Sequence, residues 1–135
     1  MKGDSTTDRD GRTALHYAAF EGQVDAIGRL ILEGADVDAQ DHRGYTPLHF
    51  AAQEFRVDAA HVLIDAGASL VVRDSYGNTV LWTATFNSRG RGELVTMLLS
   101  SGADPDSPNN SGASPRTLAA GIANYDVAQF FGGHK

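Results

Sequence analysis

One stretch of sequence returns along the chain at a fixed interval. Residues 44–52 read GYTPLHFAA, residues 11–19 read GRTALHYAA, and residues 77–84 read GNTVLWTA. Their first glycines, Gly11, Gly44 and Gly77, stand 33 residues apart, and a less exact fourth copy begins at Gly112. Such a period is typical of repeat proteins, in which each copy is a small unit that packs against the next. The period therefore constrains the fold more than any single motif does.

Each copy has the pattern of two short helices. In the second copy, Thr46 is a helix N-cap and Pro47 suits the first helical position, so a helix is predicted from Pro47 to about Glu54. Apolar residues at helical spacing then predict a second helix over residues 57–65. Gly67 supplies the left-handed residue that commonly follows a helix. The unit is a helix pair.

Turn-forming residues connect one pair to the next. Residues 69–77 end in the sequence DSYG, which favours a projecting hairpin or β-turn. Asp41 and Asp74 recur just before these turns, where an aspartate side chain bonds its own backbone. Their repetition indicates a role in the scaffold.

These motifs resemble ankyrin repeats over residues 8–131. The resemblance rests on TPLH-x-AA or a near variant in three copies, on Gly-Ala at 34–35, 67–68 and 102–103, and on the shared spacing. It implies an all-α solenoid of antiparallel helix pairs with projecting hairpin loops. We expect a single domain over residues 1–135, with repeats at about 8–40, 41–73, 74–108 and 109–131. In this family, the hairpins and first helices line a concave face that generally binds other proteins.

Composition narrows the class of partner. The 135-residue chain carries a formal net charge of −6 and a pI near 5.1, which argues against nonspecific binding to nucleic acid or anionic membranes. A basic or neutral protein partner fits the overall charge better. The chain contains no cysteine, which excludes thiolate metal sites and suits a reducing compartment. The N-terminal residues lack an apolar run, so we expect a cytoplasmic protein that is monomeric unless bound to its partner.

No catalytic or cofactor motif is present. The sequence has no P-loop, no dinucleotide-binding glycine motif, no HExxH motif and no nucleophile elbow, so we expect neither enzyme activity nor a cofactor or metal. His16 and His49 occupy the same position in two copies. We therefore interpret both as structural residues that hydrogen-bond backbone between neighbouring repeats.

Four departures from the repeat pattern leave alternatives open. Arg29 stands at a position that is apolar in the next copies, which suits an N-terminal cap or a side chain that extends over the adjoining repeat. Phe55 replaces Gly22 of the first copy and is either an exposed binding residue or an inward-packed residue in a rebuilt turn. Trp82 replaces the histidine, and we favour a half-buried position over a binding hot spot. Residues 87–92 form a basic loop with two inserted residues. One interpretation is that this loop contacts an acidic partner or phosphate. The other is that it is an insertion without functional effect, because lengthening a surface loop costs little entropy.

If the fold is correct, the partner-binding residues lie at the turn tips and on the exposed side of each first helix. Tyr45, Tyr76 and Phe86 are the expected anchors, because exposed aromatics give contact area at small entropic cost. The full predicted set comprises Arg9, Arg12, Phe20, His42, Arg43, Tyr45, Glu54, Tyr76, Asn78, Phe86, Arg89 and Arg91.

The fourth copy bears on function. Residues 114–131 are similar to the last repeat of small bacterial ankyrin proteins that act as immunity proteins beside toxins. Arg116 replaces a leucine there, as expected of a C-terminal cap. The resemblance implies a binder that inhibits a cognate toxin. The alternative is a scaffold or adaptor in a larger complex.

Overall fold

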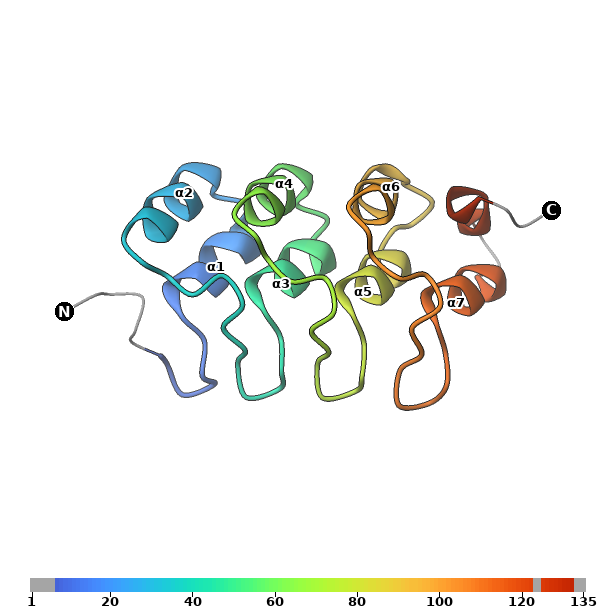
Figure 1. The fold of residues 1–135 in the computed structure, drawn as a ribbon, viewed down its shortest axis with the longest axis horizontal. Coiled ribbons are helices and arrows are strands. Elements are labelled where there is room, and N and C mark those ends of the chain that lie inside the picture. Colours follow the sequence, from blue (N-terminus) through green and yellow to red (C-terminus); the bar gives the residue numbers. More distant parts are fainter. Residues whose placement is uncertain (1–6, 123–124, 133–135) are drawn as a thin grey trace.

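The computed structural model describes residues 7–122 and 125–132, which form a row of helix pairs (Figure 1). The inner helices are α1 (Ala14–Glu21), α3 (Pro47–Gln53), α5 (Val80–Phe86) and α7 (Pro115–Gly121). The outer layer contains α2 (Val24–Leu32), α4 (Val57–Asp65), α6 (Glu93–Ser100) and the 3-10 helix η2 (Val127–Phe131). No strand occurs within the described ranges. The predicted all-α solenoid is confirmed.

The inner helices begin at the predicted caps. The hydroxyl oxygens of Thr13, Thr46 and Ser114 accept hydrogen bonds from the backbone N–H three residues later, and the side chain of that third residue accepts one from the N–H of the cap. Thr79 caps α5 through its hydroxyl in the same way. Helix α4 has the predicted bounds, and α3 ends one residue before Glu54.

The core is a ladder of equivalent apolar residues. Leu15, Leu48 and Leu81 of the inner helices are buried one repeat after another, and Leu63 and Leu98 hold equivalent buried positions in the outer layer. Alanines at the facing positions let the helices approach closely. Each repeat therefore buries its apolar surface against its neighbours, as a solenoid requires.

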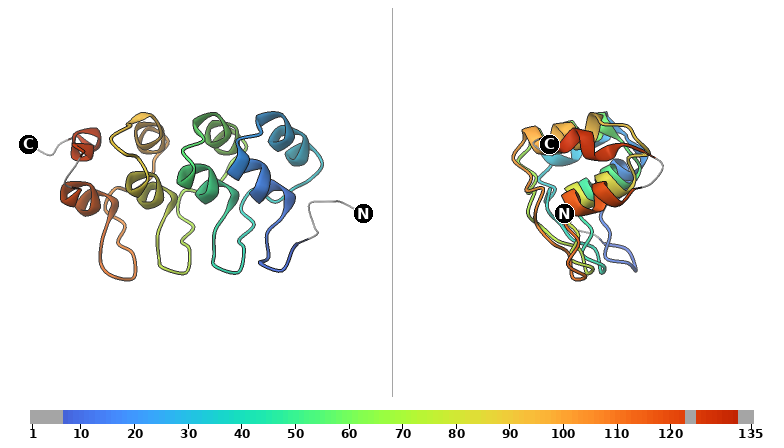
Figure 2. Two further views of the ribbon diagram at one scale, coloured as in Figure 1. Left: turned by 180° about the vertical axis from the view of Figure 1, so that it is seen from behind. Right: turned by 90° about the vertical axis from the view of Figure 1, so that its right-hand side faces the viewer.

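Finger loops project from one side of the helix layers (Figures 1 and 2). Their tips are residues 8–12, 41–45, 74–78 and 109–113. In each tip, the N–H of the first residue donates to the carbonyl of the fifth. Adjacent tips are also joined, because the backbone N–H groups of His42, Ser75 and Asn110 each donate to a carbonyl of the preceding finger. The fingers form a continuous wall along the inner helices.

The fourth repeat departs from the expected regular pair. Its second element is a 3-10 helix that buries Val127 and Phe131. Arg116 forms an ion pair with Asp106 at 2.8 Å in place of an apolar contact. Both features suit a terminal repeat with no further copy to cover. The regularity of the first three copies ends here because packing on one side is sufficient. The sequence also predicts a frayed end over residues 132–135, of which residues 133–135 lie outside the described residues.

Candidate binding surface

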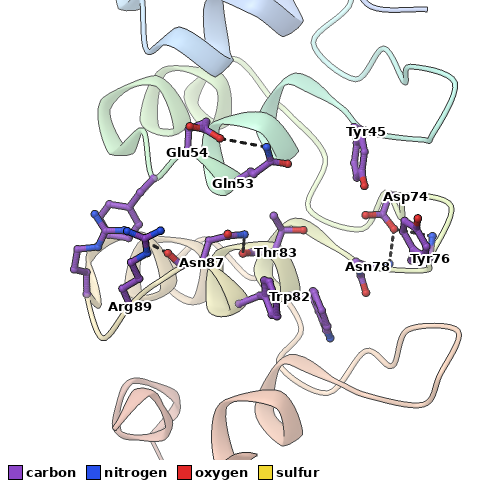
Figure 3. Close-up of a pocket in the computed structure, with 13 residues that line it drawn as sticks. Tyr45, Gln53, Glu54, Asp74, Tyr76, Asn78, Trp82, Thr83, Asn87 and Arg89 are labelled. Atoms are coloured by element: carbon purple, nitrogen blue, oxygen red, sulfur yellow. Dashed lines mark hydrogen bonds between the residues drawn. The ribbon is translucent and has the colours of Figure 1, made fainter. Parts of the chain in front are cut away.

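An open groove lies between the second and third repeats and is lined by the inner helices and the finger loops (Figure 3). The groove has a volume of about 660 Å³. Helices α3 and α5 form its floor, the tips of two fingers close one end, and the loop at residues 87–92 lies at the other. Its lining consists of Tyr45, Gln53, Glu54, Phe55, Asp74, Tyr76, Asn78, Trp82, Thr83, Phe86, Asn87, Arg89 and Arg91.

A second hollow of about 460 Å³ lies between the first and second repeats. It is lined by Arg12, His16, Tyr17, Phe20, Glu21, Arg43, Tyr45, Phe50 and Gln53. Tyr45 and Gln53 line both hollows, so the two are neighbouring parts of one inner face. Phe50 and Tyr17, which directly follow the histidine position in their repeats, are not among the residues predicted from the sequence.

Aromatic side chains dominate the apolar part of this face. The rings of Trp82 and Phe86 stack with centroids 5.4 Å apart and an angle of 13° between their planes. Phe86 is 61% exposed and Tyr76 is 57% exposed. The Tyr45 ring packs against Phe50 at 5.6 Å, and its burial raises the pKa of its phenol, so the hydroxyl stays protonated at neutral pH. Stacked or packed rings lose little entropy when a partner binds.

Arginines lie at both ends of the inner face, but they differ in how they are held. Arg12 pairs with the buried carboxylate of Asp41 at 3.2 Å. The Arg91 guanidinium lies 3.7 Å from the Phe55 ring centroid and donates to the carbonyls of Ser88 and Asn87. The Arg91 side chain in the inserted loop is thus held against the second repeat by its contact with Phe55.

The turn at Phe55 keeps the left-handed conformation of the glycine it replaces. Phe55 has a φ of 55°, close to the 72° of Gly22, so the turn is not rebuilt. The ring is nevertheless half-buried against the core and under Arg91. A non-glycine residue in this region costs about 1–2 kcal/mol. Of the two alternatives for Phe55, the inward-packed residue in a rebuilt turn is thus correct about the packing and wrong about the turn.

Most of the predicted contact residues lie on the inner face or at the finger tips. Phe20, Arg43, Tyr45, Glu54, Tyr76, Phe86, Arg89 and Arg91 line one of the two hollows, as does the partly buried Arg12. Arg9 and His42 are exposed at finger tips instead.

The structure corrects the expected exposure of Asn78. It was expected to be exposed, but it is only 9% exposed and its side-chain oxygen accepts from Asn109. Its carbonyl accepts from His49, and its N–H donates to Asp74. All of these bonds hold the scaffold together, so Asn78 belongs to the wall of the groove.

The two repeated histidines have the predicted structural role. The Nε2 atoms of His16 and His49 lie 2.9 and 3.0 Å from the carbonyl oxygens of Tyr45 and Asn78 in the next repeat, and both Nδ1 atoms bond the threonine cap. Burial lowers the pKa of both imidazoles, which favours the neutral form. Trp82 occupies this position in the third repeat, and its buried Nε1 atom has no hydrogen-bond partner.

Comparison with known families is consistent with this geometry. A family model for ankyrin repeats, in three copies, matches residues 22–109, which is more than half of the chain. The chain belongs to the ankyrin-repeat family. Ankyrin repeats are protein–protein interaction modules. Across the described residues, no helix is both long enough and apolar enough to span a membrane, and no cluster of candidate metal ligands occurs.

Proposed function

We propose that this ankyrin-repeat chain binds one partner protein through its inner face, and that the partner is a toxin whose activity is inhibited on binding. The observation that carries the binding proposal is the set of exposed aromatic side chains on this face. Tyr76 comes from a finger tip and Phe86 from an inner helix, and both line the same groove. A rigid scaffold that presents exposed aromatics beside arginines has the composition typical of interface centres.

Inhibition is the finer part of the proposal. It rests on a resemblance in sequence alone, that of residues 114–131 to the last repeat of small bacterial ankyrin immunity proteins. An inner face of this kind can cover an active site without chemistry of its own, because excluding the substrate requires only tight binding. A scaffold or adaptor would use the same face and leave its partner active.

The first experiment is affinity capture with the tagged chain from its source lysate, with identification of retained proteins by mass spectrometry. The captured partner is then purified and its activity is measured while the ankyrin chain is titrated. We expect one stoichiometric partner, a toxic enzyme, whose activity falls to zero at an equimolar ratio. Several partners that keep their activities would refute inhibition and favour the scaffold.

Matched variants test the surface. Tyr45→Ala and Tyr76→Ala should each weaken partner binding by about 2 kcal/mol, or roughly thirtyfold, as removal of a hot-spot aromatic does. Leu32→Ala is the control, because Leu32 is an 89% exposed apolar residue on outer helix α2. Circular dichroism establishes that each variant is folded. If the Leu32 variant loses affinity and the tyrosine variants do not, the binding face has been wrongly assigned.

A further inference from the structure

The repeats of this chain provide an internal standard against which each copy can be compared. Three departures from that standard fall around one groove. Trp82 replaces the histidine of the first two copies, Phe55 replaces the turn glycine, and the third repeat carries two additional residues near Arg89. Phe55, Trp82 and Arg89 all line the groove between the second and third repeats. One repeat earlier, the positions that match Phe55 and Trp82 hold Gly22 and His49, and the second repeat carries no insertion.

Each departure weakens the scaffold locally. Within the described residues, two buried side-chain polar atoms lack a hydrogen-bond partner, Trp82 Nε1 and Ser88 Oγ, and both belong to the third repeat. The two non-glycine residues with positive φ in the same part of the chain are Phe55 at 55° and Arg89 at 52°. Unsatisfied buried groups and strained backbone gather at functional sites, because packing alone would not retain them. Their coincidence here marks the groove as the principal site of the inner face.

The chemistry of the groove indicates what it accepts. The Trp82 and Phe86 stack forms an aromatic part of its lining, and the finger-tip residue Tyr76 also lines it. The exposed guanidinium of Arg89 makes no ion pair among the described residues, whereas that of Arg91 is held over Phe55. A planar guanidinium beside an apolar wall suits a carboxylate carried next to an apolar side chain.

Glu54 and Asp74 also line the groove and keep their negative charges, but among the described residues neither forms an ion pair with Arg89. The buried Asp74 carboxylate already accepts the backbone N–H groups of Tyr76 and Asn78, so it is occupied in the finger turn. Glu54 accepts from the neighbouring Gln53 side chain at 3.2 Å. The loop at residues 87–92 itself carries two arginines and no acid. The end of the groove at this loop is therefore positively charged on a chain that is acidic overall.

The outer helices carry the opposite charge. Asp25, Asp58, Asp65 and Glu93 lie on α2, α4 and α6, where Arg29 is the single arginine. An acidic partner segment is therefore repelled by the outer side and attracted to the arginine end of the groove. This segregation of charge orients an approaching segment toward the inner face.

We infer that the groove between the second and third repeats binds an extended acidic segment of the partner, with a carboxylate on Arg89 and an adjacent aromatic or aliphatic side chain on the Trp82 and Phe86 stack. This inference rests on the proposed function and narrows it to one site and one kind of partner segment. It also predicts that the hollow between the first and second repeats contributes less to affinity.

A random peptide library displayed on phage and selected on the immobilised full chain tests the inference without a known partner. We expect enriched peptides to carry Asp or Glu next to an aromatic or aliphatic residue. Synthetic versions should lose at least about tenfold in affinity on Arg89→Gln, on Trp82→His, and on conversion of their acids to amides. Arg29→Gln, an arginine exposed on α2, is the matched control and should leave affinity unchanged.

The opposing outcomes are distinct. Enrichment of basic peptides, binding that is insensitive to both groove variants, or selection of no peptide at all would overturn the inference. The same variants are then measured with the partner captured from the lysate. If that partner binds and is inhibited but ignores Arg89→Gln and Trp82→His, the inference fails and the proposed function stands. If the captured partner keeps its activity while acidic peptides bind the groove, the inhibitory function fails and the site stands.

Discussion

The two buried histidines make the stability of this protein depend on pH in a specific direction. His16 and His49 are fully buried and neutral, and burial holds the pKa of each below its ordinary value of 6.5. In the unfolded chain, both imidazoles take up protons as pH falls through about 6.5. The unfolded state then binds more protons than the folded state, so the free energy of unfolding falls. The stabilisation is complete above pH 6.5 and is lost toward the lower, folded-state pKa.

The size of the effect follows from the number of buried imidazoles. Each histidine contributes at most about 1.4 kcal/mol per pH unit in this window, so two contribute at most roughly 2.7 kcal/mol per unit. His49→Gln should remove about half of that slope. It should also lower the free energy of unfolding at neutral pH by about 1–3 kcal/mol, because the backbone N–H and hydroxyl of Thr46 lose the imidazole Nδ1 as a partner.

Urea unfolding followed by circular dichroism between about pH 7.5 and about pH 5.5 measures both quantities, above the range in which carboxylates titrate. Ile27→Val is the control, because it lowers stability by about 0.5–1.5 kcal/mol without removing a titrating group and should keep the parent slope. If the stability of the parent protein stays flat or rises on acidification over this range, His16 and His49 are not both held neutral in the folded protein. An unchanged slope in the His49 variant would refute the assignment to that residue.

Four further substitutions test the scaffold, each by urea unfolding. Gly44→Ala should lower the free energy of unfolding by about 2–4 kcal/mol, because its φ is 82° and the added Cβ would lie 2.8 Å from the Asp74 backbone. Gly67→Ala is the control and should cost only about 1–2 kcal/mol, because its φ of 95° is similar but the added Cβ would meet open space. Equal losses would contradict the role of the close approach at Gly44. Asp74→Ala should cost about 1–3 kcal/mol, since two finger N–H groups lose their acceptor, and no loss would show that water replaces it. Trp82→His should change stability by less than about 1 kcal/mol, because removing an unsatisfied N–H offsets the lost stacking; a loss of about 3–5 kcal/mol would identify Trp82 as a core residue.

The regular part of the fold was predictable because each of its determinants is local. A threonine or serine cap, an apolar residue two positions later and a glycine after the second helix each act within a few residues, and the period repeats them in register. The role of His16 and His49 was also predictable, since the same side chain at the same position in two copies must meet the same neighbour. For these features, a residue that recurs in several copies has the same structural role in each copy.

The irregular positions could not be predicted, because each is decided by a residue from another repeat. Phe55 tolerates a left-handed backbone where its ring is covered by Arg91, which lies 36 positions later. Asn78 is buried because Asn109 of the next finger bonds its side chain. Gly90 and Gly92 admit the rings of Tyr125 and Phe130, which would meet any added Cβ at less than 3 Å. Sequence spacing within one copy contains none of this information.

Net charge alone does not decide the charge of the partner segment, for a reason that the fold explains. A solenoid has two sides, and the summed charge of −6 combines acidic outer helices with an inner groove that ends in arginines. At physiological ionic strength, charges separated by more than about 8 Å are largely screened from one another, so a segment in the groove responds mainly to the side chains that line it. An acidic partner segment and an acidic binding protein are therefore compatible. Weakening of the peptide complex by added salt would support this local attraction, whereas strengthening would indicate that the overall repulsion dominates.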